Sequence, residues 1–160
     1  MLFRSINTFM ETGKDQFRLP SEAEWEFACR ARTQTPFYFG KTINISQANF
    51  NGKSTYHNGT FFEYRKQTTP VGELTENKFG LFDMHGNVGE WCADTYAKDA
   101  YSKHERKNPI CVEAGESSHV IRGGSWNSFE SSVRSAARSR NKSSYCDCTI
   151  GARLLRTIKP

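Results

Sequence analysis

The sequence predicts an irregular α+β domain with little regular structure, on the basis of three observations. The segment from Ser21 to Arg32 carries the signals of a helix start, an apolar face and a helix end. The segments 119–122, 132–138 and 150–155 are typical of short strands, which we expect to be antiparallel. The stretch 41–69 is rich in Asn, Gly, Ser and Thr and has no sustained hydrophobic period, as is typical of loops.

The helix has the strongest local signals in the chain. Ser21 at its start and Glu24 three residues later form a capping box. Acidic residues occupy its first turns and basic residues such as Arg30 its last, which suits the helix dipole. Upstream, the segment from Ile6 to Thr12 indicates the end of another helix, closed by Gly13.

The remaining segments are predicted to be extended or irregular. Residues 35–40 form an aromatic extended segment, and residues 96–118 form a polar loop. The segment 80–91 is expected to begin as a strand and to end in a glycine-rich loop. These elements alternate without any internal repeat, which favours one irregular domain.

Length and composition agree with a single domain that spans residues 1–160. A chain of 160 residues has room for one core. Only 36% of the residues are hydrophobic, but 13% are aromatic, so large rings can fill the core. The net charge of +5 comes from scattered basic residues, with no Lys/Arg run longer than two. We therefore expect a solvated basic surface, and the sequence disfavours nucleic acid as a partner.

The cysteines are odd in number, so at least one thiol is unpaired. None of their spacings matches a zinc motif. They are Cys29, Cys92, Cys111, Cys146 and Cys148. No signal peptide and no apolar run of membrane-spanning length is visible. These features favour a reducing cytoplasm, and a leader that has been cleaved off is the alternative.

Three motifs follow one another along the chain: Arg18 to Cys29 (RLPSEAEWEFAC), Gly80 to Trp91 (GLFDMHGNVGEW) and Val120 to Trp126 (VIRGGSW). In this order they resemble the formylglycine-generating enzyme family, also called the sulfatase-modifying factor domain, over residues 17–153. The resemblance implies a loop-rich version of the C-type lectin-like fold. It also implies that the N-terminal portion of the family is absent, so that the chain is N-terminally shortened. Open strand edges would then favour a homo-oligomer.

The resemblance further implies structural calcium. The family binds one ion through positions that match Asp83, Glu90 and the carbonyl groups of Gly86 and Val88. A second family site matches Asn49. Calcium takes six to eight oxygen ligands, many of them carbonyls, so these residue types suit it. The alternative is a tight turn whose carboxylates accept backbone N–H groups.

The catalytic cysteines of the family are missing. Oxidising members carry two cysteines, two and seven residues after the position of Trp126, and their thiolates bind copper. Ser128 and Val133 stand there in this chain, so the resemblance implies neither copper nor oxidase activity. Cys29 matches a family cysteine whose disulfide partner would lie near Leu154, which implies that Cys29 is a free buried thiol.

Two C-terminal loops, Asn127 to Ser132 and Ser139 to Thr149, contain Asn, Ser, Phe, Tyr, Cys, Asp and Thr. They resemble the loops of variable proteins from diversity-generating retroelements, which use the same fold and are randomised there. Ordinary surface loops are the alternative. Tyrosine among small polar residues is typical of adaptable binding surfaces.

We therefore predict a domain that binds an unknown protein or small ligand through these loops. A sulfatase-modifying-type oxidoreductase is the alternative, and a degenerate fragment with a structural role is the third interpretation. We expect segments 132–138 and 150–155 to pair, so that Phe129 and Tyr145 lie side by side on an exposed face. The predicted ligand-binding residues are Trp126, Asn127, Ser128, Phe129, Ser131, Ser139, Asn141, Ser143, Tyr145 and Asp147.

Overall fold

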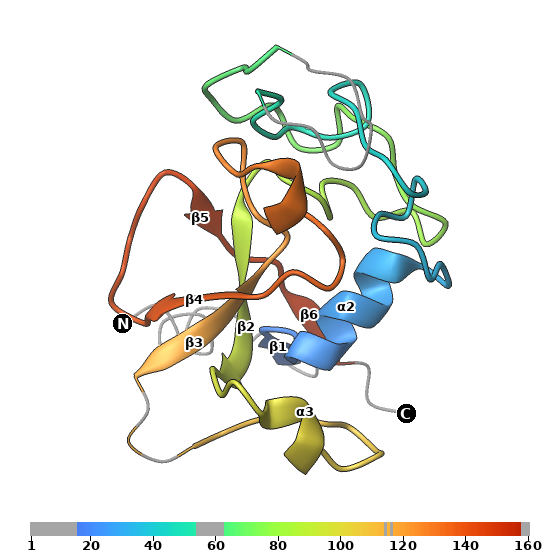
Figure 1. Cartoon of the computed structure of the whole chain (residues 1–160). Coiled ribbons are helices and arrows are strands. Elements are labelled where there is room, and N and C mark those ends of the chain that lie inside the picture. Colours follow the sequence, from blue (N-terminus) through green and yellow to red (C-terminus); the bar gives the residue numbers. More distant parts are fainter. Residues whose placement is uncertain (1–15, 54–62, 114, 116, 158–160) are drawn as a thin grey trace.

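The computed structural model describes residues 16–53, 63–113, 115 and 117–157, and a four-stranded sheet lies at its centre (Figure 1). The strand order is β4-β3-β2-β5. These strands are Gly89–Thr95 (β2), Ser118–Arg122 (β3), Ser139–Lys142 (β4) and Ile150–Gly151 (β5). The pairs β2–β3 and β3–β4 are antiparallel, whereas β5 runs parallel to β2. The sheet is therefore mixed, and the expectation of purely antiparallel strands is wrong.

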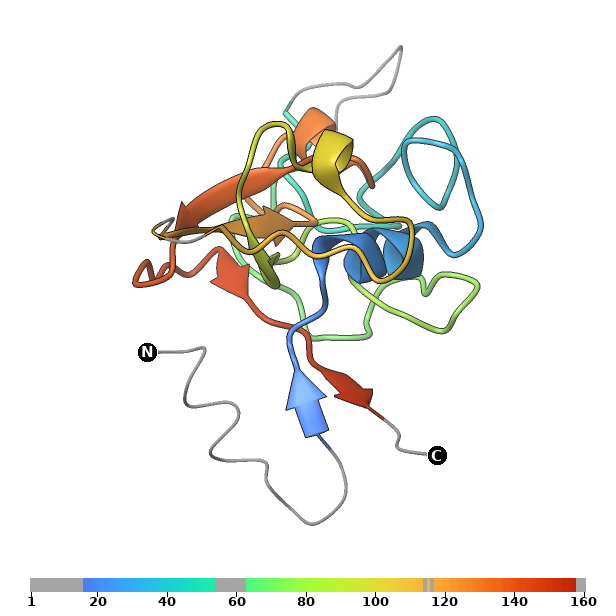
Figure 2. The ribbon, with the colours of Figure 1, turned by 90° about the horizontal axis from the view of Figure 1, so that it is seen from below.

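A second, two-stranded sheet joins the two ends of the described chain. It consists of β1 (Gln16–Arg18) and β6 (Leu155–Thr157), which pair antiparallel. Figure 2 shows these strands side by side. This pairing holds the two ends of the described chain together. The C-terminal loops adjoin strands of the larger sheet.

The predicted helix is confirmed as α2 (Glu22–Arg30), which packs against β2 and β3. Its capping box is complete, because Ser21 Oγ accepts a bond from the Glu24 amide and the Glu24 carboxylate accepts one from the Ser21 amide. The helix ends at Ala31, which adopts the left-handed conformation (φ 43°). Two short helical segments, α3 (Ala100–Lys103) and the 3-10 turn η1 (Glu130–Ser132), lie in the loops.

The predicted strand 132–138 does not form. Its start belongs to η1, and turns follow. The Ser135 amide donates to the Pro36 carbonyl oxygen, and the Arg138 side chain binds Glu22. This segment therefore bonds to another loop and to the helix, and the strand begins only at Ser139.

The predicted strand 150–155 is divided between the two sheets. Its first residues form β5 and its last residue belongs to β6. Between them Arg153 turns inward and pairs with Glu90 on β2. Because β4 and β5 lie at opposite edges of the sheet, the expected pairing of 132–138 with 150–155 is also wrong.

Other expectations have mixed outcomes. The strand at 119–122 is confirmed as β3. The segment 80–91 has the opposite order to the expected one, with turns first and strand β2 from Gly89. The segment from Ile6 to Thr12 lies outside the described residues. No helix in the described part of the chain is long and apolar enough to cross a membrane.

Aromatic rings fill much of the interior, as the composition predicts. Among the described residues, three buried clusters form the core. They are centred on Trp25 with Met84, on Phe37 with Phe50, and on Trp91 with Ile121. The first lies between α2 and the sheet, and the third supports the sheet from its other face. The sheet is thus held on both faces, which positions the loops that follow β3 and β4.

Candidate ligand-binding cleft

A cleft of about 680 Å³ lies between the two C-terminal loops. Ile121 and Ile150 provide apolar surface in it, and serine, threonine, asparagine and arginine residues provide the polar surface. Half of the ten predicted ligand-binding residues line it. These are Ser128, Ser131, Ser139, Asn141 and Tyr145.

The first loop is shaped by a glycine and two serines. Gly124 has φ 66°, and a Cβ atom there would lie 2.7 Å from Val133 Cγ1, so a side chain is excluded. The Ser125 amide donates to Ser128 Oγ at 3.0 Å. The Ser128 carbonyl oxygen accepts a bond from the Asn51 amide at 2.9 Å. Ser128 therefore holds the loop in shape as well as lining the cleft.

The second loop is shaped by Asp147. Its Oδ1 accepts bonds from the Thr149 amide at 2.7 Å and the Thr149 hydroxyl at 2.5 Å, and these bonds hold the pKa of Asp147 below its usual value. The Trp126 ring N–H lies 3.4 Å from the Cys148 carbonyl oxygen. This contact joins the two loops, so Asp147 and Trp126 act on their shape.

The two predicted surface rings are exposed, but they do not share the cleft. Phe129 is 51% exposed and Tyr145 is 44% exposed. Tyr145 lines the cleft, whereas Phe129 is outside its lining. Asn127, the first residue of the first loop, accepts a bond from the Tyr64 hydroxyl at 2.6 Å. The remaining predicted residue, Ser143, donates its amide to the Ser117 carbonyl oxygen.

Behind the sheet lies a buried ion network that the sequence did not predict. Arg122, fully buried on β3, donates to Glu22 at 2.6 Å and to Glu26. Arg138 binds both oxygens of Glu22, at 2.6 and 2.7 Å. Burial alone would raise the pKa of Glu22, but the bonds and charges of these two arginines hold it below its usual value. An arginine at the end of an apolar strand segment is the signal that could have revealed the network.

Arg138 and Arg140 both stack on one ring. Their guanidinium carbons lie 4.8 and 4.6 Å from the Tyr96 ring centroid. Arg138 also lies 4.6 Å from the Tyr101 centroid. Both arginines border the cleft, as does Arg134, which donates to the Ser131 carbonyl oxygen. Arginine stacked on an aromatic face is held in position while its N–H edge can still form hydrogen bonds.

The predicted calcium residues have mixed surroundings. Glu90 accepts bonds from Arg153 at 2.8 and 3.0 Å and from the Trp25 ring N–H at 2.7 Å. Its carboxylate thus has an arginine where the sequence predicts a cation. Asp83 Oδ2 accepts the Gly72 amide, but its Oδ1 is buried without a hydrogen-bond partner. Over the described ranges, no three His, Cys, Asp or Glu side chains form a group that could hold a metal ion.

Asn49 and Gly86 lie close together in this region. A Cβ atom on Gly86 would lie 2.1 Å from the Asn49 carbonyl oxygen, so only glycine fits. The Asn49 side chain donates to the Gln67 carbonyl oxygen, while its Oδ1 is buried and unpartnered. The Val88 side chain packs against Gly151: a Cβ atom on Gly151 would lie 3.0 Å from Val88 Cγ2. Unpartnered buried oxygens are unfavourable unless a cation or water satisfies them.

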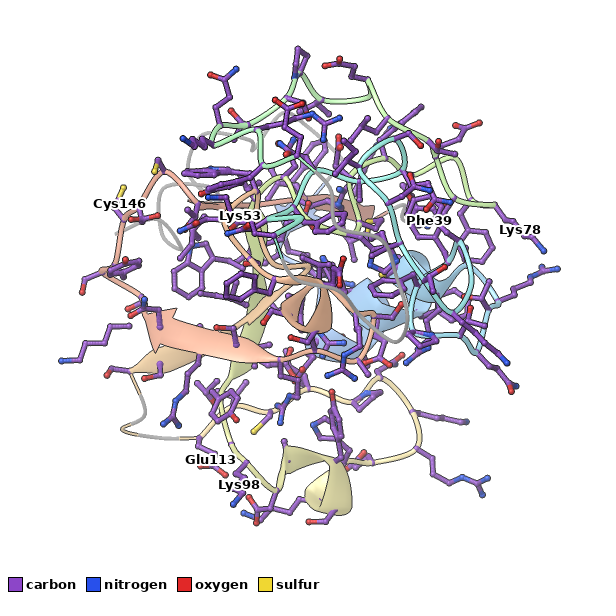
Figure 3. The ribbon with its side chains drawn as sticks, turned by 45° about the horizontal axis from the view of Figure 1, so that its top comes forward. Phe39, Lys53, Lys78, Lys98, Glu113 and Cys146 are labelled. Carbon is purple, nitrogen blue, oxygen red and sulfur yellow. The ribbon has the colours of Figure 1, made fainter. Side chains whose placement is uncertain are left out.

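The cysteines of the described residues are all free. Cys29 is free and buried, as the sequence predicts, and its sulfur lies 3.6 Å from Ser135 Oγ. Burial raises the pKa of Cys29 to about 12. Cys146 and Cys148 are exposed, and Figure 3 shows Cys146 projecting outward.

These features define a loop-rich α+β domain of the formylglycine-generating enzyme type. The chain belongs to the sulfatase-modifying factor enzyme 1-like domain family, whose model matches residues 4–158. The fold predicted from the three motifs is thereby confirmed. Among solved structures, PvdO from Pseudomonas aeruginosa is 31% identical with a TM-score of 0.81, over 98% of this chain and 60% of that one. Treponema denticola variable protein 1 is 26% identical with a TM-score of 0.63, over 88% of this chain and 47% of that one.

Similar sequences carry different names. A formylglycine-generating enzyme of Streptomyces coelicolor is 32% identical over 85% of this chain and 45% of its own length. A serine/threonine-protein kinase pkn1 of Chlamydia caviae is 39% identical over 89% of this chain but only 21% of its own length. The chain therefore spans less than half the length of either relative.

Proposed function

We propose that the chain is a ligand-binding domain and that its binding site is the cleft between the two C-terminal loops. The observation that carries this proposal is the cleft itself, whose 680 Å³ lies in the range of small-molecule sites, about 300–1,000 Å³. Its lining combines apolar surface with hydroxyl groups, an amide and the Tyr145 ring. Such side chains orient a ligand through hydrogen bonds and packing without supplying a nucleophilic thiolate.

We further propose that the loops 127–132 and 139–149 are variable in sequence among related copies of this protein. The similarity to Treponema denticola variable protein 1 supports this proposal. So does the position of Ser131, Ser139 and Tyr145, which are exposed and lie outside the core clusters. Exchanges at such positions cost little stability, usually within about 0.5 kcal/mol.

The binding site can be tested by screening small fragments against isotope-labelled protein and mapping the shifted amide resonances. We expect fragments to shift the amides of the cleft. Tyr145→Ala should weaken their binding, whereas Phe27→Ala, which removes a 67% exposed ring on α2, should not. A screen in which no fragment shifts the cleft would refute the proposal.

The competing function is an oxidoreductase of the sulfatase-modifying type. The similarity to formylglycine-generating enzymes favours it, and so do two exposed thiols, Cys146 and Cys148, on a loop that borders the cleft. At the position of the first family cysteine Ser128 offers a hydroxyl, which is a poor ligand for Cu(I). We expect no conversion of a cysteine-containing sulfatase peptide, with or without copper, by mass spectrometry. Conversion that disappears in a Cys146→Ser/Cys148→Ser variant would establish the competing function.

We also propose structural calcium beside the turn that contains Gly86 and Val88, with Asp83 as a side-chain ligand, and a second calcium site at Asn49. The unpartnered buried oxygens of these two side chains support the two sites. The first ion would neutralise Asp83 and hold the turn, while Glu90 stays with Arg153. We expect a chelator to lower the melting temperature, and calcium but not magnesium to restore it. An unchanged melting temperature would contradict the proposal.

A further inference from the structure

Three glycines line the cleft, and the backbone accounts for two of them. Gly123 and Gly124 have φ of 87° and 66°, in the left-handed region that favours glycine. Gly89, the first residue of β2, is not among the glycines with a left-handed φ, so its backbone conformation does not require glycine. Glycine weakens a strand, and in a strand it often marks the close approach of a ligand or of another backbone. The reason for Gly89 therefore lies in the space around it.

A side chain at position 89 would point toward the cleft. Figure 1 shows β2 between β3 and β5, and Gly89 is in register with Ile150 on β5. Successive residues of a strand face opposite sides of the sheet. The next residue, Glu90, faces α2, where it accepts a bond from the Trp25 ring N–H. Gly89 therefore faces the other side, which is the side of Ile121 and of the cleft.

The floor of the cleft has no room for a side chain at this position. A Cβ atom on Gly89 would lie 2.9 Å from Ile121 Cγ2 and 3.6 Å from the Thr149 carbonyl oxygen, and both of these residues line the cleft. A Cβ contact below 3.0 Å forces one of the two groups to move. The β-branched Ile121 has few alternative rotamers, so the added group would take its volume from the cleft. With glycine at position 89, the floor between Ile121 and Ile150 is bare backbone.

We infer that Gly89 is a specificity-determining residue of the cleft, and that its bare backbone receives a planar ring of the ligand. A flat ring packs closely on a planar peptide group, and Ile121 and Ile150 supply apolar contacts at its edges. Ser139, which is in register with Ile121, and Ser131 supply hydroxyls for polar substituents of the ring. This inference rests on the proposed binding function and adds the chemical class of the ligand, a planar aromatic compound with hydrogen-bonding substituents.

The ligand class is tested by NMR titration with naphthol and its saturated analogue decalol, which share a carbon skeleton and a hydroxyl group but differ in flatness. We expect naphthol to bind more tightly than the puckered decalol and to show nuclear Overhauser contacts with the Hα atoms of Gly89. Decalol binding as tightly as naphthol would overturn the inference, and so would bound naphthol without a contact to Gly89. If naphthol does not bind at about 1 mM, a concentration on the order of weak fragment affinities, the inference also fails. Other fragments that still shift the cleft amides would then leave the proposed binding function standing.

The role of Gly89 itself is tested with the matched variants Gly89→Ala and Gly151→Ala. Gly151 on β5 is also not among the glycines with a left-handed φ, and a Cβ atom there would lie 3.0 Å from Val88 Cγ2. Both variants therefore crowd a branched side chain beside the sheet. Gly151 is in register with Glu90, however, so it lies on the α2 face and outside the cleft lining.

We expect both variants to lower the melting temperature, because both overpack the interior. Gly89→Ala should also weaken naphthol binding about tenfold, as a single methyl group can in a fitted apolar pocket. Gly151→Ala should leave naphthol binding within about twofold, since it shares no cleft contact. Equal effects of the two variants on binding would overturn the inference. The contact between naphthol and Gly89 in the unaltered protein tests the same claim if a variant does not fold.

Discussion

The two faces of the central sheet differ in how far their polar side chains are already partnered. On the face toward α2, Arg122 and Arg138 both bind Glu22, and each arginine is held by several bonds. On the face that carries the cleft, Ser131 and Tyr145 are exposed and make few bonds to the rest of the chain. The face toward α2 therefore stabilises the fold, whereas side chains on the cleft face can be replaced without loss of the fold.

This difference indicates how the same scaffold can carry several functions. Neighbouring residues on β3 face opposite ways, so Arg122 belongs to the ion network and Ile121 to the cleft. A buried charge destabilises the fold when one of its partners is removed. The residues around Arg122 therefore cannot be exchanged without a loss of stability. Hydroxyls at an open cleft bond to water equally well and are not fixed.

The largest effect is expected at Glu22. Glu22→Gln removes the charge that two buried or half-buried arginines share. Breaking a buried pair in this way costs about 3–5 kcal/mol of unfolding free energy. Urea denaturation followed by circular dichroism would measure the loss.

The control for that variant is Glu113→Gln. Glu113 is exposed and lies 3.6 Å from Lys103, so its ion pair is weak. Its removal should change the unfolding free energy by less than about 0.5 kcal/mol. If both variants lose the same amount, the ion network does not distinguish the two faces.

Replacing Glu130 is expected to have a smaller effect and to stabilise the protein. Its carboxylate is buried and both oxygens lack partners in the described structure, and burial raises its pKa to about 7. The unfolded chain ionises at the ordinary pKa of a glutamate, so stability falls as the pH rises between that value and about 7. Glu130→Gln should therefore raise the melting temperature at pH 8 and change it much less at pH 5.

The result at Glu130 also bears on the contrast between the faces. Glu130 belongs to η1, which forms the second half of the first C-terminal loop. A buried charge without a partner marks a place where the framework is not optimised for stability. A melting temperature equally raised at both pH values would show that ionisation is not the cause.

Local signals in the sequence predict the helix and β3 well. Ser21 and Glu24 form the capping box that the sequence indicates, and the apolar segment before Arg122 pairs as expected. The prediction of a strand at 132–138 was wrong. The pattern of polar and apolar residues cannot reveal that Arg138 turns inward to Glu22, more than a hundred residues earlier in the chain. Long-range ion pairs leave no periodic pattern in a sequence.

The sequence predicted only part of the candidate site, because long-range contacts also determine how its loops meet. The composition of the two loops indicates an exposed polar surface, and five of the predicted residues line the cleft. The loops do not meet through the strand pairing that the sequence predicts, because β4 and β5 lie at opposite edges of the sheet. Trp126, predicted to bind ligand, connects the loops through the Cys148 carbonyl oxygen and is not among the residues that line the cleft. Spacing alone could not separate residues that shape the cleft from residues that face it.

The smallest effect on stability is expected for the double variant Phe129→Ala/Tyr145→Ala. Both rings are about half exposed and neither belongs to a core cluster. Their loss should change the unfolding free energy by less than about 1 kcal/mol, because little apolar area leaves contact with the protein. Binding in the cleft should weaken through Tyr145, which lines it, whereas Phe129→Ala alone should leave small-fragment binding unchanged. A double variant that unfolds the domain would mean that these loops are part of the scaffold, and the contrast between the two faces of the sheet would be lost.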